Sequence, residues 1–197
     1  MLDHYVYGDV SRISPEAPVP VLQRSHEKYT AGGAANVAMT LAGLGAKVQL
    51  FGMVAEDAHA QKLCELLRHH DIDCSGIHFC AAEEGTIVKT RICTKQQQLC
   101  RIDHEKTYSF YEPVPSLIES LRQACETCDA VLVSDYGKGT VTASIVQLLE
   151  DAKCFTAVDP HPQRPLAWKD LELFKPNQKE AVQIAGVSMD DPDGNEH

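Results

Sequence analysis

Short apolar runs alternate with helical patterns through the second half of the chain, and this alternation limits the fold more than any other feature. The expected strands and helices occupy, in chain order, 116–125 (helix), 130–133 (strand), 141–152 (helix), 155–158 (strand), 171–174 (strand) and a short helix from Gln178. Strands separated by helices of this length pair in parallel, and helices cover the faces of such a sheet. The sequence therefore predicts an α/β fold with a mostly parallel sheet.

A glycine-rich segment opens a helix in the first half of the chain. It reads Gly32-Gly33-Ala34-Ala35-Asn36. So bare a backbone lets a ligand approach the helix N-terminus, where amide N–H groups attract anions or hydroxyl oxygens. Asn36 adds a directional donor and acceptor suited to a sugar hydroxyl. The competing interpretation is a tightly packed helix start without a ligand.

The elements around this segment follow from hydrophobic periodicity. The helix is expected over 33–44, with Val37, Leu41 and Leu44 on its buried side and Gly45 as its C-terminal stop. A strand at 47–51 and a helix at 58–69, burying Leu63, Leu66 and Leu67, follow.

Four shorter extended segments are expected outside this core. Near the N-terminus they lie at 5–7 and 19–22, joined by a loop, and further on at 86–94 and 98–103, joined as a hairpin. Alternation along a strand places Lys89, Arg91 and Cys93 on one face of the hairpin, and Arg101 lies on its second strand. This basic face either binds an anion or is an ordinary solvated sheet face.

Composition excludes several classes of function. The formal net charge is −10 over 197 residues, which argues against nucleic acid and anionic membranes as partners. No apolar run reaches the length of a transmembrane helix and no export signal is visible, so we expect a cytoplasmic protein. The eight cysteines are therefore expected to be reduced. Cys125 and Cys128 end a helix, which favours neither a redox pair nor a zinc site.

Polar residues follow three successive strands of the predicted parallel sheet. The clusters lie at 134–139, at 159–161 and at 175–177 with Glu180. Ligands bind beyond the carboxyl ends of such strands, so Asp135 is a candidate for a hydroxyl and Lys138 for a phosphate. Asn177 and Glu180 are candidates for the water shell of a magnesium ion. Turn chemistry, a helix N-cap and complementarity to the helix dipole are the structural alternatives.

Together these features resemble the ribokinase-like (PfkB) carbohydrate kinases. The motifs are Gly32-Gly33-Ala34-Ala35-Asn36, the 134–139 loop and the pair Asn177 and Glu180. Within that family, the segments 11–20 (Ser-Arg-Ile-Ser-Pro-Glu-Ala-Pro-Val-Pro) and 97–103 (Gln-Gln-Leu-Cys-Arg-Ile-Asp) resemble heptose-7-phosphate kinase domains of ADP-heptose synthesis. The resemblance extends to about residue 185.

The resemblance implies a ribokinase-like fold with a small β lid and phosphoryl transfer from ATP, with Mg²⁺, to the anomeric hydroxyl of a heptose 7-phosphate, a precursor of lipopolysaccharide. The resemblance implies that the sugar is held by Asp3, Gly32, Gly33 and Asn36, and Asp135 is also assigned to substrate binding. The substrate phosphate would be bound by Lys89, Arg91, Arg101 and Lys138. Near ATP would lie Asn177 and Glu180, with Glu180 reaching magnesium through water. It also implies a homodimer contact through the lid.

The sequence departs from the family pattern in several places. Ala55 stands where glycine is usual before the acidic position of Asp57, and His161 where lysine is usual. The family has a core strand before the segment matching Met1, and a Gly-Ala-Gly-Asp segment that carries the general base. No Gly-x-Gly-Asp occurs in this sequence.

We therefore expect a partial kinase domain over 1–186, incomplete at both termini. Lid strands would lie at about 5–24 and 86–103, and a loose acidic tail at 187–197. No catalytic base is assigned, and negligible kinase activity is expected from the chain alone. The alternatives are a non-catalytic sugar-phosphate-binding or dimerisation module, or a PfkB-type kinase for fructose or a nucleoside. A dinucleotide oxidoreductase is disfavoured because Gly43 and Gly45 end a helix.

Overall fold

The computed structural model describes residues 1–80, 85–105, 111–162, 166–169 and 171–186. The chain divides into two compact units, Met1–Phe110 and Tyr111–His197, and each is described by itself. The predicted acidic tail, 187–197, lies outside the described residues, and the domain boundary at 186 stays a prediction.

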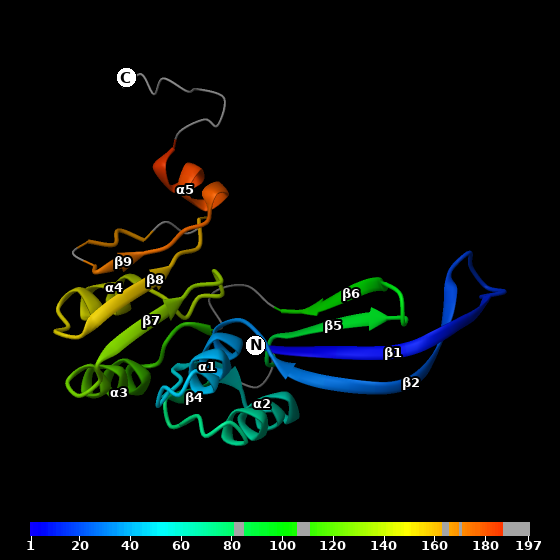
Figure 1. Cartoon of the computed structure of the whole chain (residues 1–197), viewed down its shortest axis with the longest axis horizontal. Helices are drawn as coiled ribbons and strands as arrows, with labels where there is room; N and C mark the ends of the chain where they lie inside the picture. The colour runs from blue at the N-terminus through cyan, green and yellow to red at the C-terminus, as the bar shows by residue number, and fades with distance from the viewer. Residues whose placement is uncertain (81–84, 106–110, 163–165, 170, 187–197) are drawn as a thin grey trace. The chain divides into compact units, whose positions relative to one another are not determined.

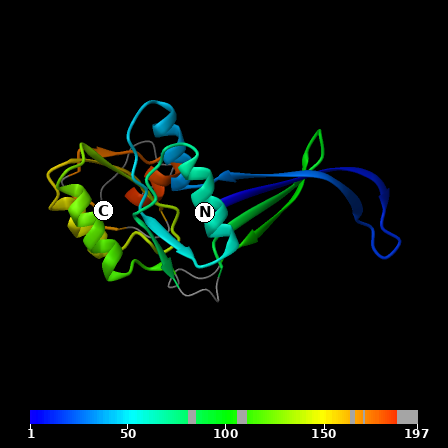
Figure 2. The ribbon, with the colours of Figure 1, turned by 90° about the horizontal axis from the view of Figure 1, so that it is seen from below.

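The first unit contains a four-stranded sheet in the order β2-β1-β5-β6. Its strands are β1 (Leu2–Ile13), β2 (Pro20–Ala31), β5 (Val88–Cys93) and β6 (Gln98–His104). β1 pairs antiparallel with β2 and parallel with β5, and β5 pairs antiparallel with β6. The hairpin predicted from β5 and β6 is confirmed. The strands run side by side away from the helices of the unit (Figures 1 and 2).

β1 and β2 are much longer than the short segments predicted at 5–7 and 19–22. Each has twelve residues, and Ser14 N–H donates to the Val19 carbonyl at 2.9 Å where the two strands meet. Beyond its root this sheet carries polar residues on both faces, so neither strand shows the half-buried alternation that marks a strand in sequence. Their length comes from cross-strand hydrogen bonds that local patterning does not reveal.

The core of the first unit lies at the root of that sheet. Two helices, α1 (Ala34–Gly43) and α2 (Ala58–Arg68), and two parallel strands, β3 (Gly52–Ala55) and β4 (Ile77–Cys80), surround it. The buried cluster joins the sheet residues Leu2, Ala31 and Val88 to Leu63 and Leu67 of α2. The helix predicted at 58–69 is thereby confirmed to within one residue.

Two predictions in this region were wrong. The strand expected at 47–51 begins instead at Gly52, because the buried run is Met53 to Ala55, and its partner β4 was not predicted. α1 buries Ala35 and Ala38, whereas Leu44 is 80 % exposed. Small residues face the core because the helix approaches it closely. Gly45, with φ of 93°, follows the end of the helix as predicted.

The second unit is a parallel α/β layer, as predicted. Its elements are α3 (Pro115–Cys125), β7 (Ala130–Ser134), α4 (Ala143–Glu150), β8 (Phe155–Asp159), β9 (Leu173–Phe174) and α5 (Gln178–Ala185). The strands pair in parallel in the order β7-β8-β9 (Figure 1). Helices α3 and α4 bury their apolar stripes, but α5 buries no residue.

The cysteines behave as expected for reduced thiols. All eight are free, and Cys125 is the last residue of α3, so the Cys-x-x-Cys pair does end a helix. Burial, followed by the neighbouring Cys154 and Cys128 thiols, raises the pKa of Cys125 to about 12, which leaves it a poor nucleophile. None of the helices in the described ranges is long and apolar enough to cross a membrane.

Candidate functional site

The N-terminus of α1 is built from glycines, and one carboxylate lies against it. Gly33 is the N-cap, with φ of 57° and no side-chain capping bond, so a left-handed backbone conformation requires glycine there. The start of β1 runs alongside, and Gly32 N–H donates to the Met1 carbonyl at 3.1 Å. A Cβ on Gly32 would lie 2.7 Å from Asp3 Oδ2. Glycine at position 32 therefore makes room for the Asp3 carboxylate.

Asp3 is held by Arg91 from the neighbouring strand. Arg91 Nη1 donates to Asp3 Oδ1 at 2.6 Å, and the two side chains are only 20 % and 16 % exposed. The guanidinium also lies 5.2 Å from the centre of the Tyr5 ring, within range of a cation–π contact. The hydrogen bond from Arg91 to Asp3 raises the pKa of Arg91 above its ordinary value. The structure thus joins two residues predicted separately.

Lys89 and Arg101 lie on the same face as Arg91 and are also ion-paired. Lys89 Nζ lies 3.0 Å from Asp103 and 3.5 Å from Glu105, and Arg101 holds Asp103 through two bonds of 2.7 and 2.9 Å. Partial burial opposes ionisation of Asp103, but bonds from Lys89 and Arg101 outweigh it and lower the pKa. The face that the sequence suggested was basic therefore carries both signs of charge.

Asp103 and Glu105 are the site residues that sequence reasoning missed. The same alternation that placed Lys89 and Arg91 together also places Arg101, Asp103 and Glu105 on one side, and the register pairs Asp3 with Lys89 and Lys89 with Asp103. We call Asp3, Lys89, Arg91, Arg101 and Asp103 the charged face. Carboxylates of this kind can accept hydrogen bonds from hydroxyls, and lysine and arginine side chains can bind a phosphate that competes with their carboxylate partners.

Asn36 follows the two glycines in the sequence and is not a member of the charged face. It is exposed in the first turn of α1, where its N–H donates to the Gly33 carbonyl at 3.0 Å and its carbonyl accepts from Thr40 Oγ1 at 3.0 Å. These bonds engage its backbone, and the residue is exposed to solvent in the first turn of the helix. That position suits a hydrogen bond to a ligand hydroxyl.

In the second unit, the three polar strand ends meet as predicted. Ser134 is paired with Asp159 across β7 and β8, and Asp135 N–H donates to the Asp159 carbonyl at 3.0 Å. Lys175 Nζ lies 3.5 Å from Asp159 Oδ1. The clusters at 134–139, 159–161 and 175–177 thus line one edge of the sheet, because all three strands run parallel.

Within this edge, Asp135 takes part in a turn. Its Oδ1 accepts from Gly137 N–H at 2.7 Å, and Gly137 has φ of 64°. The turn packs against His161, since a Cβ on Gly137 would lie 2.7 Å from His161 Nδ1. Lys138 follows in the same turn and is half-buried.

Asn177 and Glu180 form a capping box at the start of α5. Asn177 Oδ1 accepts from Glu180 N–H at 3.0 Å, and Glu180 Oε2 accepts from Asn177 N–H at 2.7 Å. This is the structural alternative that the sequence left open. The carboxylate still lies at a helix start, so the two roles are compatible. Within the described part of the chain, no group of three or more metal-ligating side chains is gathered.

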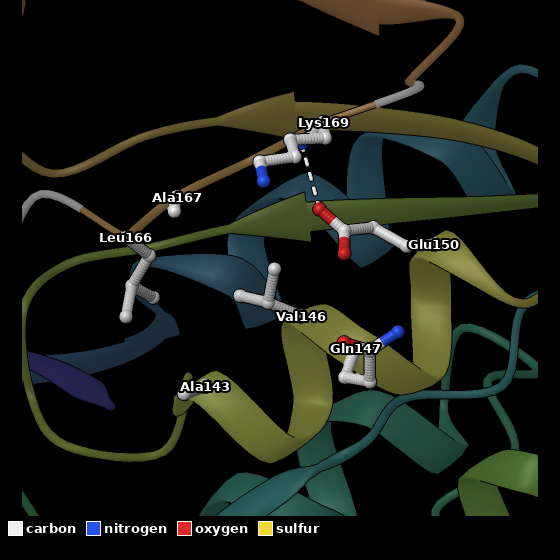
Figure 3. A pocket seen from close by; sticks show the side chains of 7 residues that line it. All are labelled: Ala143, Val146, Gln147, Glu150, Leu166, Ala167 and Lys169. Atoms are coloured by element: carbon white, nitrogen blue, oxygen red, sulfur yellow. Dashed lines mark hydrogen bonds between the residues drawn. The ribbon is translucent and has the colours of Figure 1, made fainter.

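A pocket in the second unit is lined by other residues. It is lined by α4 and the segment before β9, through Ala143, Val146, Gln147, Glu150, Leu166, Ala167 and Lys169. Figure 3 shows Glu150 reaching across it, where its Oε1 accepts from Lys169 N–H at 2.7 Å. It contains no predicted site residue.

Comparison with known proteins identifies the class of protein to which this fold and site belong. The family model described as pfkB family carbohydrate kinase matches residues 2–196. The chain therefore belongs to the PfkB family of carbohydrate kinases, and the predicted ribokinase-like α/β fold is confirmed.

Two curated relatives make the likeness more particular. The bifunctional protein HldE of Proteus mirabilis is 37 % identical over 193 residues, which are 97 % of this chain and 40 % of that protein. HldE of Haemophilus influenzae is 38 % identical over 189 residues, 94 % of this chain and 39 % of that protein. The chain thus spans about two fifths of the length of these relatives.

Solved structures agree at the level of the fold. Phosphofructokinase-2 from Escherichia coli, in complex with substrates and products, superposes with a TM-score of 0.69 at 19 % identity, covering 98 % of this chain and 62 % of that one. Ribokinase from Arabidopsis thaliana, complexed with ribose and ATP, gives 0.64 at 18 % identity, covering 94 % and 60 %.

Proposed function

We propose that this chain is the sugar-binding part of a heptose-7-phosphate kinase, which transfers a phosphoryl group from ATP to the anomeric hydroxyl. One observation carries the proposal: the Asp3–Arg91 pair lies directly against Gly32 at the uncapped start of α1. Asp3, Gly32, Gly33 and Asn36 would hold sugar hydroxyls, and Lys89, Arg91 and Arg101 the substrate phosphate. The identity to HldE proteins supports the heptose as substrate.

The same proposal assigns roles at the strand ends of the second unit. Asp135 would accept from a sugar hydroxyl and Lys138 would bind a phosphate. Asn177 and Glu180 would lie near ATP, with Glu180 binding Mg²⁺ through water, since magnesium keeps much of its water shell and takes few carboxylates. When bound, magnesium neutralises the charge that develops on the transferred phosphoryl group. A cytoplasmic location, where ATP is available, is part of the proposal.

The proposal places the general base outside residues 1–197. The sequence has no Gly-x-Gly-Asp, and the chain covers 60–62 % of the two solved kinases. Apolar residues on one face of the β7-β8-β9 sheet are also exposed: Leu132 and Phe155 are each 48 % exposed and Leu173 is 47 % exposed. A family fold with helices on both sheet faces would bury them.

Calorimetry with D-glycero-D-manno-heptose 7-phosphate tests the sugar site directly. We expect binding by the purified chain that Arg91→Met weakens at least about tenfold, the scale of one lost hydrogen bond between charged groups. Arg24→Met is the matched control, because Arg24 is also ion-paired on the four-stranded sheet, with Glu27 at 3.1 Å, but is 64 % exposed and away from Gly32.

Equal affinity of the wild type and Arg91→Met would contradict this site. A coupled ADP-release assay measures the other half of the proposal, for which we expect no turnover by the chain alone. Robust turnover would show that the base lies within these 197 residues. Tighter binding of fructose 6-phosphate than of the heptose phosphate would favour another PfkB-type kinase.

A homodimer formed through the four-stranded sheet is also part of the proposal. The relevant face lies opposite the charged face and carries Val6, Val10, Ile92 and Ile102, by the strand register. Helices α1 and α2 cover only the root of this face, where Leu2 and Val88 are buried. Ile102 is 58 % exposed, as expected for a face that a second copy covers.

A further inference from the structure

A buried hydroxyl lies at the point where the four-stranded sheet leaves the core of the first unit. Thr86 is 1 % exposed and precedes β5, the strand that carries Lys89 and Arg91. Its neighbour Ile87 accepts a hydrogen bond from Leu2 N–H at 2.9 Å. Burying a hydroxyl is costly unless it is fully bonded, so its partners identify what it does.

Those partners come from two other elements. Thr86 Oγ1 donates to Asp57 Oδ1 at 2.8 Å and accepts from Ala55 N–H at 3.2 Å. Thr86 N–H donates to Asp57 Oδ2 at 2.7 Å. Asp57 Oδ1 also accepts from Ala60 N–H at 2.8 Å, which caps α2. The Asp57 carboxylate therefore joins the start of α2 to the root of β5, and the Thr86 hydroxyl joins both to the end of β3.

The carboxylate is ionised in this arrangement. Partial burial opposes ionisation, but the bonds from the Thr86 and Ala60 N–H groups and from the Thr86 hydroxyl outweigh it and lower the pKa of Asp57. Hydrogen bonds to a charged acceptor are stronger than neutral ones. The junction is thus held by three charge-assisted bonds rather than by apolar packing alone.

We propose that Asp57 and Thr86 are positioning residues, which set the direction in which β5 leaves the core and so place Lys89 and Arg91 against Asp3 and Gly32. The geometry supports this because only Ile87 and Val88 separate Thr86 from Lys89 in the chain. A small change of backbone direction at Thr86 moves the strand and both cations together. The expected effect on ligand binding rests on the proposed sugar-phosphate site, whereas the expected effect on the direction of β5 does not.

Two variants of Thr86 separate the hydroxyl from the shape of the side chain. Thr86→Val keeps the shape and removes the hydroxyl, while Thr86→Ser keeps the hydroxyl. We expect hydrogen exchange of the β5 amides in the full chain to quicken about tenfold in Thr86→Val, the scale of a lost bond to a charged group. Thr86→Ser should restore slow exchange to within about threefold.

Asp57→Asn is the complementary variant. Asparagine caps a helix as well as aspartate does, so its oxygen can keep the bonds to Ala60 and the Thr86 hydroxyl. Its amide group would then face Thr86 N–H, and two donors cannot pair. We expect faster exchange in β5 with exchange in α2 unchanged.

Thr156→Val is the matched control, because Thr156 is 2 % exposed and lies in the second unit. The proposal is overturned if Thr86→Val quickens β5 exchange no more than Thr156→Val does, if Thr86→Ser fails to rescue, or if α2 and β5 quicken equally.

Calorimetry with the heptose phosphate adds the functional readout. We expect Thr86→Val and Asp57→Asn to weaken binding at least fivefold, because both would displace Lys89 and Arg91, and we expect Thr86→Ser to bind nearly as the wild type does. None of the three substitutions removes a proposed ligand contact, so a loss of affinity would be indirect. If the wild type does not bind at all, the proposed function fails, whereas the exchange measurements still decide whether this junction positions the strand.

Discussion

At the scale of single residues, the start of α1 depends on the absence of one methyl group. The Asp3 carboxylate occupies the space that a Cβ on Gly32 would need, and Arg91 holds that carboxylate at 2.6 Å. Gly32 thus serves the pairing of Asp3 with Arg91, whereas Gly33 is needed for its positive φ. Glycine is therefore needed at these two adjacent positions for different physical reasons: space at position 32 and backbone conformation at position 33.

Gly32→Ala should destabilise the chain by about 1–3 kcal/mol, the usual cost of forcing an extra group into a filled space. Urea unfolding followed by circular dichroism measures this cost. Gly43→Ala is the control: apart from its chain neighbours and the backbone of its own helix, no atom would lie within 4 Å of the added Cβ. The helix propensity of alanine should therefore make that variant neutral or stabilising.

A double substitution tests whether the clash in Gly32→Ala is with the Asp3 carboxylate. In an Asp3→Ala background the space is free, so the same substitution should cost less than half as much. An undiminished cost would show that the methyl group clashes with something other than the Asp3 carboxylate.

At the scale of elements, helices α2 and α5 have similar N-terminal caps but differ in how much they bury. Asp57 caps α2 and Asn177 caps α5, each by accepting from the backbone of the first turn. α2 buries Leu63 and Leu67, while α5 buries nothing. The apolar stripe of α2 and a possible N-cap at Asn177 were both predicted from the sequence. Which of the two helices packs its residues against the rest of the protein could not be predicted locally.

The β7-β8-β9 sheet shows the same contrast between its two faces. Val133, Thr156 and Val158 are buried on one face, while Leu132, Phe155 and Leu173 are about half exposed on the other. Apolar strands of parallel sheets are normally covered on both faces, which is why the sequence predicted a doubly covered sheet.

Phe155→Ser should therefore lower the free energy of unfolding by no more than about 1 kcal/mol, because about half of the side chain is already exposed. Val158→Ala, at a position 1 % exposed on the same strand, should cost about 2 kcal/mol. Urea unfolding of the two purified variants makes the comparison. Similar losses for both would mean that the Phe155 face is covered in the isolated chain.

At the scale of the whole molecule, the face of the four-stranded sheet opposite the charged face is the surface expected to join two copies. We expect the purified chain to sediment as a dimer at micromolar concentration, and Ile102→Glu to sediment as a monomer because it buries a charge in the interface. Leu44→Glu is the control, since Leu44 is 80 % exposed at the end of α1. A monomeric wild type, or a dimer in Ile102→Glu, would contradict the proposed contact.

The local sequence determined much of this protein. Apolar periodicity predicted α2, α3, α4 and the parallel strands β7 and β8 to within a few residues, because those elements bury regular stripes. Motif chemistry also predicted the glycine start of α1 and the strand-end clusters. The resemblance to PfkB kinases, which the family comparison confirms, rested on residues that lie at turns and helix starts.

Only the tertiary structure decided how the polar groups are paired. No local pattern connects Asp3 with Arg91, 88 positions later, or Asp57 with Thr86. Pairing across a sheet depends on register between distant strands, and burial depends on what covers a face. For the same reason, the full length of β1 and β2 and the pairing of Asp3 with Arg91 and of Lys89 with Asp103 emerged only from the fold.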